Sequence, residues 1–220
     1  MITDYSIQAI AVNAIPLVFA ITIHEAAHGY AARRFGDNTA YMLGRVSLNP
    51  LKHIDPVGTI LIPLLLILTS APFLIGYAKP VPVNFGRLRN PRIDSIWVAL
   101  AGPGSNFAQA LLWAILLIAL VGFGVNERFL LAMSQAGITW NLVLLVFNLF
   151  PLPPLDGGRI LSSLLPARQS IALGKLEPWG FFIVLALVFT GVIGSLWMEP
   201  LIAFFKAIIY FVTLPLQMIF

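Results

Sequence analysis

Ile23-His24-Glu25-Ala26-Ala27-His28-Gly29 is the stretch of sequence that decides the fold of this chain. His24 and His28 are four residues apart, so on an α-helix their imidazoles lie on one face, about 6 Å apart, and can hold one metal ion. Glu25 lies next to this face, where it can reach a metal-bound water without being a ligand itself. The spacing is the His-Glu-x-x-His pattern of zinc sites, which predicts a helix here.

The segment that leads into this pattern is apolar, and 10–23 contains no charged residue. A lone histidine in such a segment is more often a satisfied polar group or a helix–helix hydrogen bond than a ligand. Ionisable groups in hydrocarbon cost roughly 2–3 kcal/mol or more each, so they are rare there and tend to mark function. Spacing and location together therefore favour a metal site within the membrane.

The composition indicates an integral membrane protein. The 220 residues are 59% hydrophobic and 10% charged, and the mean hydropathy is +0.92. We expect one membrane-embedded domain over 1–220, with a core at about 7–165 and two C-terminal helices over 178–220. The basic residues lie between apolar segments, where they indicate topology rather than nucleic-acid binding. No cleavable signal peptide is expected, because the N-terminal apolar run continues into the metal motif.

The hydrophobic pattern predicts an all-α polytopic membrane protein of about five to six transmembrane helices, with a re-entrant segment and short β-strands at the membrane surface. The long helices are expected at about 4–35, 95–123, 129–150, 178–196 and 200–220. A polar connection is expected at 167–177, a short turn at 197–199, and the surface strands at 40–48 and 80–85.

The segment 57–77 is long enough to span, but prolines interrupt it and basic residues follow it. A full crossing would place those basic residues outside, against the positive-inside tendency. We therefore favour a re-entrant hairpin with both ends in the cytoplasm, although a crossing stays open. The hairpin places 11 of the 13 basic residues on the cytoplasmic side, where His28 can also meet Asp156.

Asp156 follows a proline-rich break at the end of the 129–150 helix. Pro151, Pro153 and Pro154 stop that helix, and Gly157-Gly158 is expected to permit a tight turn that presents Asp156. The carboxylate could cap a helix over 159–165, and it could be the third protein ligand of the metal. The two roles are compatible.

Three further polar residues are candidates for supporting roles. Asn106, in an apolar helix beside a Gly102-Pro103 kink, needs a partner, which is either another helix or a substrate. Asn148 or Asn106 could hydrogen-bond the substrate backbone or a developing oxyanion. His53 is more simply an interfacial loop histidine than a direct participant, and its role stays open.

Zinc suits this donor set. The chain has no cysteine, so His24, His28 and Asp156 would hold one zinc ion per chain, and a fourth position would remain for water. Other divalent ions suit such ligands too. Glu25 would take the water proton as general base and hand it to the leaving amine of a peptide.

The motifs in this order resemble those of the site-2 protease family of intramembrane zinc metalloproteases. They are His24-Glu25-Ala26-Ala27-His28, Ala101-Gly102-Pro103-x-x-Asn106 and Asn148-x-x-Pro151-x-Pro153-Pro154-Leu155-Asp156-Gly157-Gly158. The resemblance spans about 7–165. It implies zinc ligands His24, His28 and Asp156, with Glu25 as catalytic acid–base. The form is compact, without the PDZ or nucleotide-sensing domains of many relatives.

The resemblance also implies partners and a location. The substrates would be membrane proteins cleaved in or near their transmembrane segments, in regulated intramembrane proteolysis. The site would lie toward the cytoplasmic side of a bacterial-type inner membrane. A metal transporter would instead distribute acidic residues and histidines along a path, often in repeated halves, and no internal repeat is evident. A catalytically inactive scaffold would tolerate loss of a ligand, yet all four positions are intact.

Overall fold

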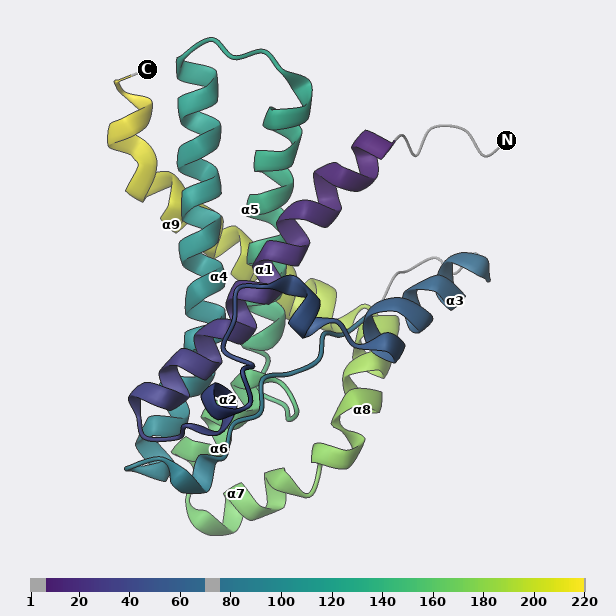
Figure 1. Ribbon diagram of the computed structural model, residues 1–220, viewed down its shortest axis with the longest axis vertical. Coiled ribbons are helices and arrows are strands. Elements are labelled where there is room, and N and C mark those ends of the chain that lie inside the picture. Colours follow the sequence, from purple (N-terminus) through teal and green to yellow (C-terminus); the bar gives the residue numbers. More distant parts are fainter. Residues whose placement is uncertain (1–6, 70–75, 220) are drawn as a thin grey trace.

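The computed structural model describes residues 7–69 and 76–219, and within these ranges it contains helices and connecting segments but no β-strand (Figure 1). The α-helices are α1 (Ile7–Arg34), α2 (Thr39–Met42), α3 (Ile62–Leu68), α4 (Pro91–Gly122), α5 (Arg128–Asn148), α6 (Asp156–Leu164), α7 (Ala167–Gly174), α8 (Glu177–Phe189) and α9 (Glu199–Gln217). Shorter helical turns are η1 (Pro50–His53), η2 (Pro56–Leu61), η3 (Phe85–Arg87) and η4 (Gly194–Met198). The all-α prediction is confirmed for the described residues.

Among the described residues, four helices are long and apolar enough to cross a membrane: Gln8–Arg34, Pro91–Gly122, Arg128–Asn148 and Gly194–Gln217. A fifth span is possible in length and composition if α7 and α8, which bend by 68°, are taken together. Large apolar side chains such as Leu112, Phe123 and Phe211 point outward from the bundle, which suits a surface in contact with lipid. The chain is therefore a polytopic integral membrane protein, and its described residues hold four or five candidate spans, which meets the expected five to six at the lower end.

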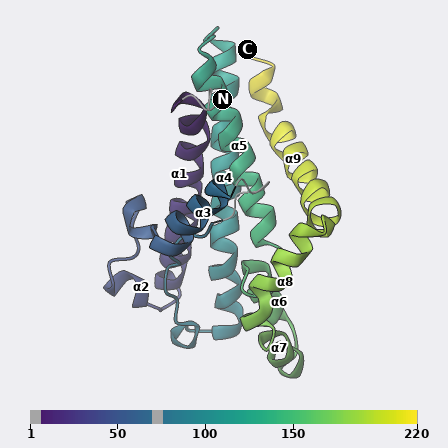
Figure 2. The same cartoon turned by 90° about the vertical axis from the view of Figure 1, so that its right-hand side faces the viewer.

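The helix bundle is built around α4 and α5, with α1 on one side and α9 on the other (Figure 2). Ala110 and Ala114 of α4 pack against Leu142, Leu145 and Val146 of α5 and Ile209 of α9. The Trp197 indole N–H donates to the Val146 carbonyl at 2.9 Å, which ties η4 to α5. η4 and α9 thus pack against the centre of the bundle. The C-terminal end of α1 and the N-terminal end of α4 lie near α6 (Figure 1).

The segment that the sequence predicts as re-entrant contains η2 and α3. These two elements hold 13 residues, about 20 Å at 1.5 Å per residue, against roughly 30 Å for a hydrocarbon core. The Tyr77 N–H donates to the Gly58 carbonyl at 3.1 Å, and the Thr59 hydroxyl donates to the Tyr77 carbonyl at 2.8 Å. The two ends of the segment therefore lie side by side, while 70–75 fall outside the described residues.

Three local predictions were wrong. A strand was expected over 40–48, but Thr39–Met42 form α2, because the Asp37 carboxylate accepts the Thr39 N–H at 3.0 Å and starts a helical turn. The connection over 167–177 is largely the helix α7. The break between the last two helices precedes η4, at Gly191 with φ +74°, rather than at 197–199. The other surface strand, 80–85, is extended over 80–84 but has no strand partner among the described residues.

Candidate metal centre

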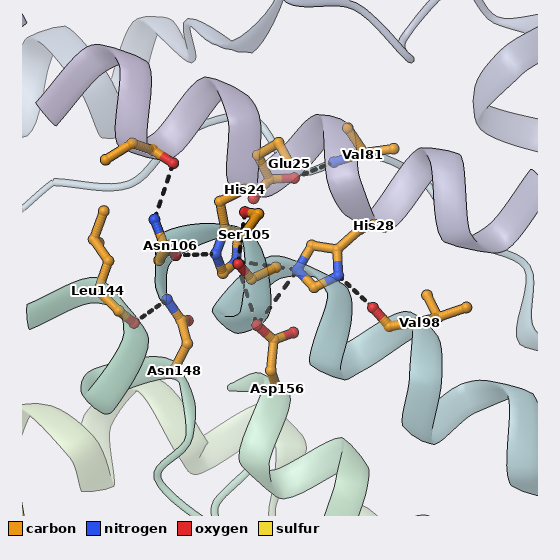
Figure 3. A network of polar contacts seen from close by, with 12 residues as sticks. His24, Glu25, His28, Val81, Val98, Ser105, Asn106, Leu144, Asn148 and Asp156 are labelled. Carbon is orange, nitrogen blue, oxygen red and sulfur yellow. Dashed lines mark hydrogen bonds and ion pairs between the residues drawn. The ribbon is translucent and has the colours of Figure 1, made fainter. Parts of the chain in front are cut away.

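The three predicted ligands meet at one point between α1, α4 and α6 (Figure 3). The His24 and His28 Nε2 atoms of α1 lie 3.3 and 3.4 Å from Asp156 Oδ2, and 3.0 Å from each other. Asp156 is the first residue of α6, and its side chain makes no capping hydrogen bond, since Leu155 occupies the cap position. The capping role is therefore a correction: the carboxylate faces the histidines instead.

Backbone packing explains why two glycines follow Asp156. A Cβ at Gly157 would lie 2.1 Å from the Leu149 carbonyl oxygen, and a Cβ at Gly158 would lie 2.1 Å from the Pro153 nitrogen. Neither glycine has a positive φ. Their role is to let the first turn of α6 pack directly on the proline-rich loop, which fixes the position of Asp156, rather than to form a tight turn.

A chain of side-chain amides orients His24. The Asn141 amide N–H donates to the Gly137 carbonyl at 2.9 Å, and its oxygen accepts from the Asn106 amide N–H at 3.0 Å. Asn106 also donates to the Ala20 carbonyl at 3.2 Å. The Asn106 oxygen is then left to accept from His24 Nδ1 at 2.6 Å. His24 therefore carries its proton on Nδ1 and presents an Nε2 lone pair to the centre.

Asn106 thus has a helix partner, which is one of the two alternatives that the sequence left open. It is fully buried, and its amide is occupied by groups of α1 and α5, so it is not available to a substrate in this structure. Asn141, which was not among the predicted site residues, completes the same network. The feature that could have indicated Asn141 is its position as a polar residue in the apolar helix α5, as for Asn106 in α4.

His28 is oriented in the same way by the backbone of α4. Its Nδ1 donates to the Val98 carbonyl at 2.7 Å, so Nε2 again carries a lone pair. Two lone pairs 3.0 Å apart beside a carboxylate repel each other unless a positive charge lies between them. Asp156 Oδ2 is moreover buried, without a hydrogen-bond partner in the described part of the chain. These observations fit a divalent cation.

Gly102 of α4 completes the pocket around the two imidazoles. A Cβ at this position would lie 2.4 Å from His28 Nε2 and 2.6 Å from His24 Nε2, well inside contact distance. Only glycine lets α4 approach the ligand atoms this closely. The sequence indicated a kink at Gly102-Pro103, but not this direct contact with the ligand atoms.

A cleft of about 270 Å³ opens beside the three ligands and contains Glu25, Val81, Asn148 and Arg159. Glu25 Oε2 accepts the Val81 N–H at 2.7 Å, which fixes the carboxylate next to His24. The Asn148 amide donates to the Leu144 carbonyl at 2.9 Å. Arg159, one turn after Asp156, lies 4.1 Å above the Phe85 ring and 3.8 Å from Glu177. The cleft thus joins a carboxylate, an amide and a cation around the ligand cluster.

The chain matches known proteins over most of its length. It is 40% identical to YwhC of Bacillus subtilis, which has the provisional name of a zinc metalloprotease, over 86% of this chain and 84% of that protein. It is 31% identical to Rip2 of Mycolicibacterium smegmatis, named in the same way, over 86% of this chain and 70% of Rip2. The sequence profile of peptidase family M50 matches residues 130–191.

The chain belongs to peptidase family M50. The resemblance to the site-2 proteases is thereby confirmed, and so is zinc as the metal of this protein. Membership makes the chain a zinc metalloprotease embedded in a membrane. No solved structure matches the chain.

The extended segment that holds Glu25 in this M50 chain is itself fixed at both ends. Arg45 donates to the Lys79 and Pro80 carbonyls at 3.0 and 3.3 Å, and Asp37 Oδ2 accepts the Asn84 N–H at 2.7 Å. Burial raises the pKa of Asp37, but the hydrogen bonds from Thr39 and Asn84 outweigh it and hold the pKa below its usual range. Asp37 is therefore an anchor that needs its negative charge.

Replacing Asp37 by asparagine should lower the free energy of unfolding by about 1–3 kcal/mol, because an amide N–H would face the buried donors of Thr39 or Asn84. A lowered native pKa means that the charge stabilises fully above the unfolded pKa of about 3.9, and that this stability is lost as pH falls through the native pKa. Thermal unfolding from pH 7 to pH 3 checks both points. An Asp37→Asn protein that keeps the wild-type acid dependence would contradict the anchor role.

Replacing Asn106 by leucine should weaken zinc binding by about 10–100-fold, the usual cost of losing a hydrogen-bond partner behind a metal-ligating histidine. Zinc titration against a competing chelator measures this directly. Asn13, which lies far from the cluster on α1, gives the control Asn13→Leu, for which we expect wild-type affinity. Equal zinc affinity for the two variants would mean that the amide network does not orient His24.

Proposed function

We propose that this chain is a site-2-type intramembrane metallopeptidase that hydrolyses peptide bonds in or near the transmembrane segments of other membrane proteins. The observation that carries the proposal is the convergence of His24, His28 and Asp156 on one point, with Glu25 beside them in a cleft of the helix bundle. His24, Glu25 and His28 come from a helix apolar enough to span the membrane. A substrate that reaches this cleft must itself lie at the membrane.

His24, His28 and Asp156 would hold one zinc ion, which supplies a Lewis acid for the scissile carbonyl and acidity for a water molecule. Glu25 would accept a proton from the attacking water molecule while the oxygen of that water bonds to the carbonyl carbon. The same proton passes from Glu25 to the amide nitrogen, so that the carbon–nitrogen bond breaks and an amine leaves. The Val81 N–H keeps the Glu25 carboxylate in place for both transfers.

Asn148 is proposed as the substrate-binding residue of the cleft. One of its amide hydrogens is engaged by Leu144, and the second can donate to a substrate carbonyl or to the developing oxyanion. Its position in the same cleft as Glu25 supports this role. Asn106 is not proposed for it, because its amide is fully engaged.

The site is proposed to lie toward the cytoplasmic side of a bacterial-type inner membrane. Arg33 and Arg34 end α1, and the basic residues before α4 and along α6 and α7 lie at the same end of the bundle (Figure 1). This asymmetry suits the positive-inside tendency. The adjacent ends of the 57–77 segment support the re-entrant alternative. The proposed partners are lipid and membrane-protein substrates, not nucleic acid.

The proposal is tested by incubating purified protein, in detergent or lipid, with a panel of tagged single-pass membrane proteins. Metal content is measured on the same samples, and Glu25→Gln and a chelator serve as controls. We expect zinc near one per chain, and cleavage of at least one substrate that both controls abolish. Folded wild-type protein without bound metal, or cleavage that survives both controls, would overturn the proposal.

A further inference from the structure

A second and larger groove lies between α1 and α5, beside residues of the segments 50–59 and 76–78. Its volume is about 550 Å³, within the range of pockets that bind a ligand. The walls are mostly apolar. They include Val18 and Ile21 of α1, Val143 and Leu144 of α5, and His53 of η1.

This groove is adjacent to the catalytic cleft along three parts of the chain. Thr22 lines the groove and Glu25 lines the cleft, about 4.5 Å farther along α1. Leu144 lines the groove and Asn148 lines the cleft, about 6 Å farther along α5. In the extended segment, Ala78 belongs to the groove and Pro80 to the cleft. The two spaces are therefore separated by about one helical turn.

His53 gives the groove a polar group without a partner. The residue is only 3% exposed, and its Nε2 lies 2.9 Å from the Ser47 carbonyl oxygen. Because a carbonyl only accepts, Nε2 must carry the proton, and Nδ1 is then an acceptor. Nδ1 is buried and has no hydrogen-bond partner in the described part of the chain. A buried acceptor of this kind usually has a donor.

We propose that the groove binds the apolar flank of the membrane segment to be cleaved, and that His53 Nδ1 accepts a backbone N–H from it. The inference rests on the proposed function, since it names a subsite beside the same catalytic residues. An extended peptide advances about 3.3 Å per residue, so residues about two to five positions from the scissile bond reach the groove. A peptide unwound in the membrane has N–H groups that need acceptors, whereas a lipid acyl chain has no N–H group to donate to His53.

Site-specific photocrosslinking tests the occupant. In one protein, a benzophenone amino acid replaces Val143 in the groove. In a control protein, it replaces Leu112, which is 64% exposed on α4. Both proteins carry Glu25→Gln and are reconstituted in phosphatidylcholine with a fluorescent membrane-spanning peptide of leucine and alanine flanked by lysines. We expect saturable labelling of the peptide from position 143, competed by unlabelled peptide, and only non-saturable labelling from position 112.

The readout separates the groove from the proteolytic function, because labelling needs no turnover. Saturable labelling without any cleavage in the substrate panel would support the groove while the proposed function fails. Cleavage with equal labelling from positions 143 and 112 would overturn the groove alone. If position 143 labels phosphatidylcholine and not the peptide, the groove binds lipid, and this result would also overturn the inference.

His53→Gln tests the acceptor, since the glutamine NH₂ group can still donate to the Ser47 carbonyl while its carbonyl oxygen does not occupy the position of Nδ1. We expect peptide labelling at position 143 to need about two- to tenfold more peptide for half-saturation, with unchanged zinc content and thermal unfolding. Val143→Trp, which fills the groove, should weaken cleavage of a membrane substrate through KM, and Leu112→Trp should not. Wild-type half-saturation in folded His53→Gln protein would overturn the role of His53.

Discussion

Glu25→Gln should lower the rate of peptide-bond hydrolysis by about 10²–10⁴-fold, the usual contribution of a positioned general base. Glutamine has nearly the same shape as glutamate, and its carbonyl oxygen can still accept the Val81 N–H that Glu25 accepts at 2.7 Å. What it cannot do is take up a proton. Because Glu25 lies beside the three ligands without belonging to their cluster, the variant should bind zinc as the wild type does.

The experiment compares cleavage rate and zinc content for Glu25→Gln, wild type and a matched carboxylate variant. Glu199 lies in the first turn of α9, away from the cleft, so Glu199→Gln should retain wild-type turnover. A fall in kcat without loss of zinc would assign the proton transfers to Glu25. Loss of zinc in Glu25→Gln would instead make Glu25 part of the metal-binding structure, and full turnover would remove it from the mechanism.

The ligand cluster could be predicted from the sequence because two of its residues are fixed by local geometry. The four-residue spacing of His24 and His28 determines their common face on any helix. The charge asymmetry of the loops then brings Asp156, 128 residues after His28 in the sequence, to the same end of the bundle. The helical period and the distribution of basic residues can both be read from the sequence, so the prediction of the cluster needed no knowledge of tertiary packing.

The supporting residues could not be predicted because their roles depend on contacts between distant helices. Asn106 could equally have faced a substrate, and only its contacts with Ala20 and Asn141 assign it to His24. Likewise, the pattern over 40–48 suited a strand, but the buried Asp37 carboxylate starts a helical turn there. Hydrogen bonds of this kind override local propensity.

Gly102→Ala should weaken zinc binding by about 10–100-fold or more, and should reduce proteolysis in proportion to the lost metal. In an ordinary helix the same change stabilises by up to about 1 kcal/mol, since alanine is the better helix former. Here the added methyl group would lie 2.4 Å from His28 Nε2. Either α4 moves away from α1 or the imidazoles rotate, and both changes break the geometry that the ligands need.

Gly104 supplies the matched control, because it lies two residues away on the same helix and a Cβ there meets nothing within 4 Å. Gly104→Ala should bind zinc as the wild type does and unfold at the same or a higher temperature. Zinc titration and thermal unfolding of both variants separate an effect on the ligands from an effect on the helix. If Gly102→Ala binds zinc normally, then α4 does not press on the imidazoles, and the closeness of Gly102 to the ligands has no part in forming the metal site. If it loses zinc but still folds, the glycine is needed for the space that the metal and its two histidines occupy.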